Sequence, residues 1–116
     1  MSIQRIKCGS RMSQAVVCNG IVSTAGQVAL RAAGEDAEKQ TADILSAIDE
    51  LLTEAGTDKS KLLTASIWLA DIKDFNAMNK VWDAWIVPGE APTRACVESR
   101  LAAPQFTVEI AVTASV

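Results

Sequence analysis

Short runs of apolar and β-branched residues open the chain and predict β-strands. Two such runs, residues 14–19 and 21–24, are joined at Asn19-Gly20. This dipeptide favours a tight hairpin, because the two-residue turn needs positive φ at both positions. Residues 3–7 predict a third short strand beside the hairpin.

Two later segments carry apolar residues at helical spacing. Residues 36–55 have a one-sided apolar stripe, acidic residues at the N-terminal end and Gly56 in the position of a C-terminal cap, so they predict a long helix. Residues 74–86 predict a second helix that ends before Pro88-Gly89. Its expected buried stripe, whether core or subunit contact, is Phe75, Met78, Trp82, Trp85 and Ile86.

Three further strands complete the pattern and define the fold class. Residues 62–70 are nearly all apolar, which indicates a strand buried on both faces. Residues 93–99 predict another strand, and residues 106–115 alternate apolar and polar positions. The order β-β-β-α-β-α-β-β is typical of an α+β fold with both helices on one sheet face. We therefore expect a second copy of the chain to cover the other face, as in a homo-oligomer.

Composition narrows the possible functions. The 116 residues predict one domain over 1–116, with a net charge of −3 and no histidine. Histidine-dependent nucleophile pairs and imidazole metal ligands are thereby excluded, and the acidic balance disfavours a general nucleic-acid binder. The cysteines, Cys8, Cys18 and Cys96, contain no C-x-x-C pair, so we expect reduced thiols and no zinc site. Neither a signal peptide nor a membrane-spanning run is evident, which predicts a cytoplasmic protein.

Arginine and glutamate are the main candidates for chemistry. Arg94, Cys96 and Glu98 share one face of a predicted strand, and Glu109 is a lone carboxylate in an apolar strand. Arg94 and Glu109 could form a structural ion pair across neighbouring strands. Alternatively, Arg94 could bind an anion beside Glu109 acting as a base. Cys96 is either an inert packed thiol, the commoner role, or a nucleophile activated by Arg94.

Glycine at position 26 is the remaining local feature. It interrupts the strand pattern after the hairpin, within Ala25-Gly26-Gln27. A glycine in that context marks a bulge or a close approach to the backbone, by a ligand or by another chain.

The segment Pro92-Thr93-Arg94-Ala95-Cys96-Val97-Glu98, followed by Leu101 and Val108-Glu109-Ile110, resembles the signature of the Rid (reactive intermediate deaminase) family, also called YjgF-type. The hairpin through Gly26-Gln27 and the helix around Asn79 are similar as well, so the resemblance covers nearly the whole chain. It implies a chorismate-mutase-like fold and a homotrimer in which the sheets form a central barrel, with three sites at the subunit clefts.

The resemblance also implies a reaction and a set of site residues. Active members hydrolyse 2-imino acids such as 2-iminobutanoate and 2-iminopropanoate, or their enamines, to 2-keto acids and ammonia without a cofactor or metal. Arg94 would bind the substrate carboxylate and Glu109 would position or activate water. The surroundings of the pocket would come from Gly26, Cys96, Asn79 and Met12. Met12 and Ala25 stand where other residues are frequent in the family.

Two alternatives to general imine clearance follow from the same residues. One is a non-catalytic trimer that binds small carboxylates. The other is a specialised catabolic deaminase of an aminoacrylate-like or aminomuconate-like intermediate.

Overall fold

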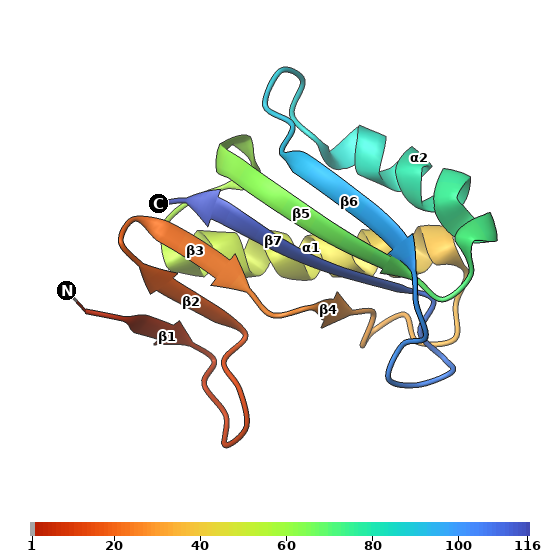
Figure 1. The fold of residues 1–116 in the computed structure, drawn as a ribbon, viewed down its shortest axis with the longest axis horizontal. Helices are drawn as coiled ribbons and strands as arrows, with labels where there is room; N and C mark the ends of the chain where they lie inside the picture. Colours follow the sequence, from red (N-terminus) through yellow and green to blue (C-terminus); the bar gives the residue numbers. More distant parts are fainter. Residues whose placement is uncertain (1) are drawn as a thin grey trace.

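The computed structural model describes residues 2–116, which contain seven strands, two α-helices and two short 3-10 helices, Lys59–Lys61 and Ile72–Asp74 (Figure 1). In chain order the elements are β1 (Gln4–Ile6), β2 (Ala15–Cys18), β3 (Ile21–Thr24), β4 (Gln27–Val28), α1 (Ala37–Ala55), β5 (Leu62–Leu69), α2 (Phe75–Trp85), β6 (Thr93–Glu98) and β7 (Val108–Ser115). The predicted order is confirmed, with the short strand β4 as an addition.

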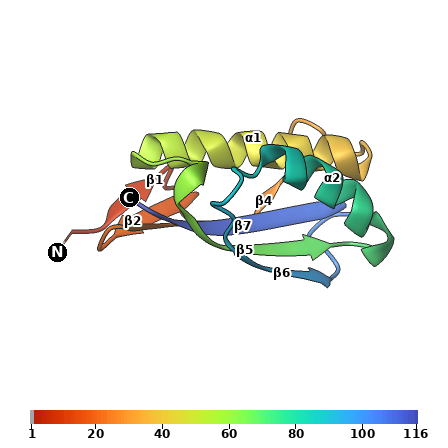
Figure 2. The same ribbon diagram turned by 90° about the horizontal axis from the view of Figure 1, so that it is seen from above.

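The strands form one mixed sheet whose order places β6 at one edge. The order is β1-β2-β3-β7-β5-β6, and β4 pairs with β7 beyond the end of β3. Only β5 and β6 run parallel; the other pairs are antiparallel. Both helices lie on the same face of this sheet, as predicted, and the opposite face, called here the open face, carries no helix (Figure 2).

Local sequence signals account for the ends of the main elements. Asn19 and Gly20 have φ of 54° and 74°, which forms the predicted tight turn between β2 and β3. Asp36 caps α1 by accepting a hydrogen bond from the Lys39 backbone N–H at 2.9 Å. Gly56 ends the helix with φ of 87°. Among residues 2–116, no helix combines the length and apolar character needed to cross a membrane.

The core lies between the helices and one face of the sheet. Ile44, Ile48 and Leu52 of α1 are fully buried against Ile67 of β5 and Ile110 of β7. The core side chains of β5 and β7 alternate along each strand with side chains that face outward, since successive residues of a strand point to opposite faces.

The prediction that residues 62–70 are buried on both faces is wrong for the single chain. Ala65, Ile67 and Leu69 face the core, whereas Ser66 is exposed and Trp68 is only half-buried. Since both helices lie on one face, nothing else in the described chain covers the open face. The open face nonetheless carries apolar side chains, those of Val16, Ile21, Trp68, Val97 and Ala111 among them.

A buried glutamine ties α1 to the loop that precedes β7. The Gln40 side chain is fully buried; its amide donates to the carbonyls of Glu35 and Gln105, both at 2.9 Å, and accepts from the Thr107 backbone N–H at 2.9 Å. Thr107 is two residues before Glu109. Gln40 therefore fixes the path by which the chain enters β7.

Replacing Gln40 with leucine should destabilise the protein by about 2–4 kcal/mol. The substitution removes three hydrogen bonds. The Gln105 carbonyl keeps the Gly34 N–H as a donor, but the Glu35 carbonyl and the Thr107 N–H lose their partner, and each buried polar group left without one costs about 1–3 kcal/mol. Urea unfolding at matched protein concentration measures the change. The matched control is Gln105→Leu on the exposed loop, which keeps the backbone carbonyl and should shift stability by less than about 0.5 kcal/mol. Equal losses for the two variants would contradict this role of Gln40.

Candidate functional site

Arg94 lies on the edge strand and points toward helix α2. Its register partner on β5 is Ala65, which is buried under the helices, so both side chains lie on the helix side of the sheet. The Arg94 Nη1 donates a hydrogen bond of 2.6 Å to the Asn79 Oδ1. Since arginine only donates, the amide oxygen must be the atom that faces it. Arg94 and Asn79, two of the residues that the resemblance implies for the site, thus lie together in the fold.

Two aromatic rings of α2 also contact the Arg94 guanidinium. The Arg94 Cζ is 5.8 Å from the ring centroid of Phe75 and 5.4 Å from that of Trp82. Both distances fall within the range of a cation–π interaction. Trp82 is buried, as predicted, but Phe75 is 36% exposed, so its assignment to the buried stripe was wrong. Phe75 lies in the first turn of α2 and packs beside the arginine of the edge strand.

The backbone of β6 presents unpaired groups next to Arg94. The Ser99 N–H donates to the Leu69 carbonyl of β5 at 2.8 Å. Alternate residues of a strand direct their backbone groups to the same side, so the N–H and C=O of Cys96 point away from β5. Within residues 2–116 no strand pairs with that side of β6. The Cys96 N–H is therefore available to a ligand or to another chain.

Glu109 lies on the open face, between Trp68 of β5 and Val28 of β4. Its half-buried carboxylate also approaches Gly26 so closely that a Cβ at that position would overlap it. The close approach predicted at Gly26 is therefore made by a side chain of the same chain rather than by a ligand or another chain. Gly26 leaves room for the Glu109 carboxylate in this position.

The hypothesis of an Arg94–Glu109 ion pair across neighbouring strands is wrong. Strand β5 lies between β6 and β7, and the two side chains leave the sheet on opposite faces. The same geometry means that one protomer alone does not place Glu109 beside an anion bound to Arg94. Met12 is likewise remote from Arg94, since it is exposed on the loop between β1 and β2, at the other edge of the sheet.

Cys96 points into the protein rather than toward a ligand. Its side chain shares the helix side with Ile67 and packs against the core. Burial raises the pKa of the Cys96 thiol above its ordinary value, although the nearby Arg94 charge acts in the opposite direction. The thiol is therefore protonated at neutral pH, which favours the inert role over that of a nucleophile.

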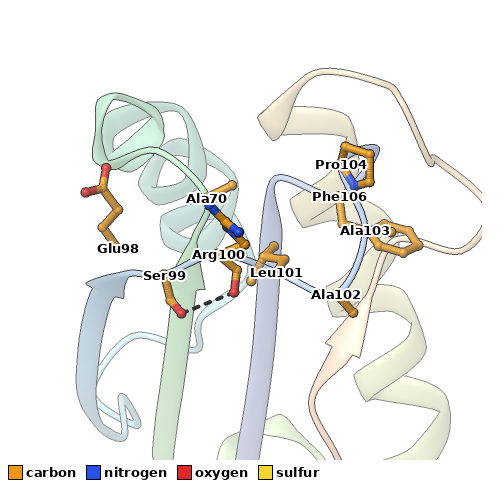
Figure 3. Close-up of a pocket in the computed structure, with 9 residues that line it drawn as sticks. All are labelled: Ala70, Glu98, Ser99, Arg100, Leu101, Ala102, Ala103, Pro104 and Phe106. Atoms are coloured by element: carbon orange, nitrogen blue, oxygen red, sulfur yellow. Dashed lines mark hydrogen bonds between the residues drawn. The ribbon is translucent and has the colours of Figure 1, made fainter.

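A separate cavity of about 650 Å³ lies at the end of β6 (Figure 3), and neither Arg94 nor Glu109 lines it. The loop after β6 lines it with Arg100, Leu101, Pro104 and Phe106. Glu98 also borders it, and the Glu98 Oε1 accepts a hydrogen bond from the Ile72 backbone N–H at 3.1 Å. Glu98 is the third residue of the predicted Arg94-Cys96-Glu98 face, and this bond gives its carboxylate a structural role.

Sequence patterns alone did not identify the contact of Phe75 and Trp82 with Arg94, or the role of Gln40. The sequence did contain a signal for the contacts with Arg94, because Phe75, Asn79 and Trp82 are spaced i, i+4 and i+7 and so share one helix face. Gln40 interrupts the apolar stripe of α1 at a core position, where a polar residue requires partners.

Residues 2–116 match the family model described as Endoribonuclease L-PSP. The chain is 44% identical over 114 residues to a RutC family protein of Haemophilus ducreyi, covering 98% of this chain and 97% of that protein. It is also 44% identical over 116 residues to the RutC family protein YoaB of Escherichia coli, covering 100% of both. A crystal structure of a YjgF family member from Neisseria meningitidis superposes with a TM-score of 0.95 at 47% identity, covering 99% of this chain and 95% of that one.

Iodoacetamide should alkylate Cys96 at least about tenfold more slowly than Cys8 at pH 8. Cys8 is exposed, whereas Cys96 is half-buried and its thiol resists deprotonation. Mass spectrometry of the two cysteine peptides over time gives both rates. In denaturant the difference should disappear, and a Cys96 rate equal to that of Cys8 in the folded protein would contradict the inert assignment.

Proposed function

The chain belongs to the YjgF family, also called the Rid family, and on that premise we propose that it hydrolyses 2-imino acids or their enamine tautomers to 2-keto acids and ammonia. Water adds to the electrophilic C=N carbon, the nitrogen takes up protons, and ammonia leaves as the C=O bond forms. No electrons are transferred, so the reaction needs orientation and a proton acceptor rather than a redox group.

The observation that carries this proposal is that the Arg94 guanidinium has N–H groups without a hydrogen-bond partner among the described residues. Among the described residues its side chain makes one hydrogen bond, through Nη1 to Asn79, so the N–H groups of Nη2 and Nε can receive a ligand. A guanidinium matches a carboxylate with two parallel hydrogen bonds. The neighbouring Cys96 N–H adds a neutral donor at the same strand edge. Together these groups suit the carboxylate of a small 2-imino acid.

Glu109 is the proposed base, and it would act across a subunit boundary. Its carboxylate lies on the open face beside Gly26, between the register partners Trp68 and Val28, while Arg94 lies on the helix side. The two can meet only if Arg94 of one protomer approaches Glu109 of the partner subunit. The apolar side chains of the open face support such an assembly, because an exposed apolar sheet face is typical of a subunit contact. A trimer, as the family resemblance implies, would provide three such sites.

A second candidate, a non-catalytic carboxylate-binding protein, is favoured by one observation. A single protomer contains all the anion-binding groups around Arg94, but it does not place Glu109, the proposed base, beside them. A protein that has the anion-binding groups but no base next to them would bind 2-keto acids and hydrolyse no imine. Thermal stabilisation by pyruvate without hydrolysis of any imine in a substrate panel would identify it.

Ribonuclease activity, suggested by the description of the matching family model, has less physical support. The chain has a net charge of −3, whereas RNA binding relies on basic residues that neutralise phosphates. It also lacks histidine, a common acid–base group near neutral pH.

Arg94→Ala should lower kcat/KM for 2-iminopropanoate by about 100-fold, since the substrate loses its charge-assisted partner. Glu109→Gln should act mainly on kcat, by about 100-fold or more, because it removes the proton acceptor with little change in shape. An amino-acid oxidase generates the imine, and semicarbazide traps what remains. Arg100→Ala, which removes an exposed arginine beyond the end of the same strand, is the matched control and should retain activity.

Two outcomes would contradict these roles. Imine loss with the wild-type protein that is no faster than with Arg94→Ala would rule out the deaminase. Full activity in Glu109→Gln would remove Glu109 from the mechanism while leaving Arg94 in place.

The protein should assemble into a trimer of about 37 kDa from chains of 12.3 kDa, measured by light scattering after size-exclusion chromatography. Trp68→Glu should shift it toward monomer, because a buried unpaired charge on the open face is costly. Ser46→Glu adds the same charge to the exposed side of α1 and should leave the trimer intact. A wild-type monomer at micromolar concentration would argue against a site shared between subunits.

A further inference from the structure

The two aromatic rings that contact Arg94 have a role that family membership does not assign. We infer that Phe75 and Trp82 are positioning residues that hold the Arg94 guanidinium so that its unoccupied N–H groups face an incoming carboxylate. This inference rests on the proposed function of Arg94 as a carboxylate anchor. It concerns affinity and orientation rather than the hydrolytic step.

One face of α2 presents both rings to the guanidinium. Phe75 and Trp82 are seven residues apart on one face of α2, which separates them by about 10.5 Å along the helix axis. The Arg94 Cζ is 5.8 Å from one centroid and 5.4 Å from the other. The guanidinium therefore contacts two rings that belong to different turns of the same helix face.

The three contacts constrain different motions of the side chain. The bond from Nη1 to the Asn79 Oδ1 fixes one end of the guanidinium but permits rotation about that contact. The two ring contacts oppose movement of the guanidinium away from this face of the helix. Among the described residues, the N–H groups of Nη2 and Nε have no hydrogen-bond partner. Pre-organisation of this kind reduces the entropy that a ligand would otherwise have to offset on binding.

Trp82 is itself held by a chain of contacts that reaches α1. Its ring lies 5.4 Å from that of Trp85, and the Trp85 Nε1 donates to both carboxylate oxygens of Asp49 at 3.1 and 3.0 Å. Lys59 covers the Trp85 ring at 5.4 Å. The Trp82 ring is therefore held in place by contacts with the rest of the fold, while the partly exposed Phe75 provides the second ring contact to Arg94.

Phe75→Leu tests the inference with little risk to folding, because Phe75 is 36% exposed and leucine keeps an apolar side chain there. The dissociation constant of pyruvate, a stable 2-keto acid, should rise about threefold, the size of an exposed cation–π contribution. Trp82→Leu should raise it about tenfold, and Trp82→Phe should restore most of the affinity. The matched control is Phe106→Leu, which removes the chain's other phenylalanine from the loop after β6 and should change nothing.

A readout independent of ligand is the Arg94 Nε–Hε cross-peak in a ¹H–¹⁵N spectrum. Loss of either ring should move this peak through the lost ring current, and Phe106→Leu should not. Displaced peaks together with weaker pyruvate binding support the inference. Displaced peaks with unchanged binding, or unchanged peaks, overturn it.

Failure of the proposed function is measured separately. A wild-type protein that binds pyruvate but hydrolyses no imine would contradict the deaminase and leave the positioning role standing. A wild-type protein that does not bind pyruvate would rule out the carboxylate anchor and the positioning role with it. If instead wild-type and Phe75→Leu proteins bind pyruvate equally well, the carboxylate anchor stands and only the positioning role is wrong.

Discussion

The two-residue alternation of the strands, combined with helices on only one sheet face, is the constraint on which the rest of the structure depends. It directs Arg94 toward α2 and Glu109 toward the open face. A shift of either strand by one residue would reverse the side on which its functional residue lies. The core opposes such a shift, because Ile67 and Ile110, which are paired across β5 and β7, would leave the interior. Packing and function therefore depend on the same register.

Each candidate residue is held by structure outside its own strand. Gln40 of α1 fixes the loop that leads to Glu109, and Gly26 leaves space for the carboxylate itself. Arg94 depends on Asn79 and on the aromatic residues of α2. The two halves of the proposed site are thus built independently, one by each helix, at different places in the protomer. Apposition of two copies would complete the site without a change in either half.

Local signals in the sequence were sufficient for the elements but not for their pairing. The Asn19-Gly20 turn, the Gly56 cap and the alternating strand each depend on neighbours in sequence, and each was predicted, although the strand was expected over residues 106–115 and begins at Val108. The ion pair between Arg94 and Glu109 failed because it assumed that β6 and β7 are adjacent. The parallel pairing of β5 with β6 separates them, and it joins segments about 30 residues apart that no short motif specifies.

The central claim is that Arg94 and Glu109 act together only across a subunit boundary, and subunit mixing tests it most directly. Arg94→Ala and Glu109→Gln proteins, each inactive alone, would be unfolded together and reassembled in equal amounts. In mixed trimers, Arg94 of one subunit can still meet the intact Glu109 of the partner subunit, and random assembly predicts about a quarter of wild-type imine hydrolysis. If both residues served one site within a protomer, no mixture would contain an intact site. Activity that stays at the level of the separate variants, in trimers verified to be mixed, would contradict the account.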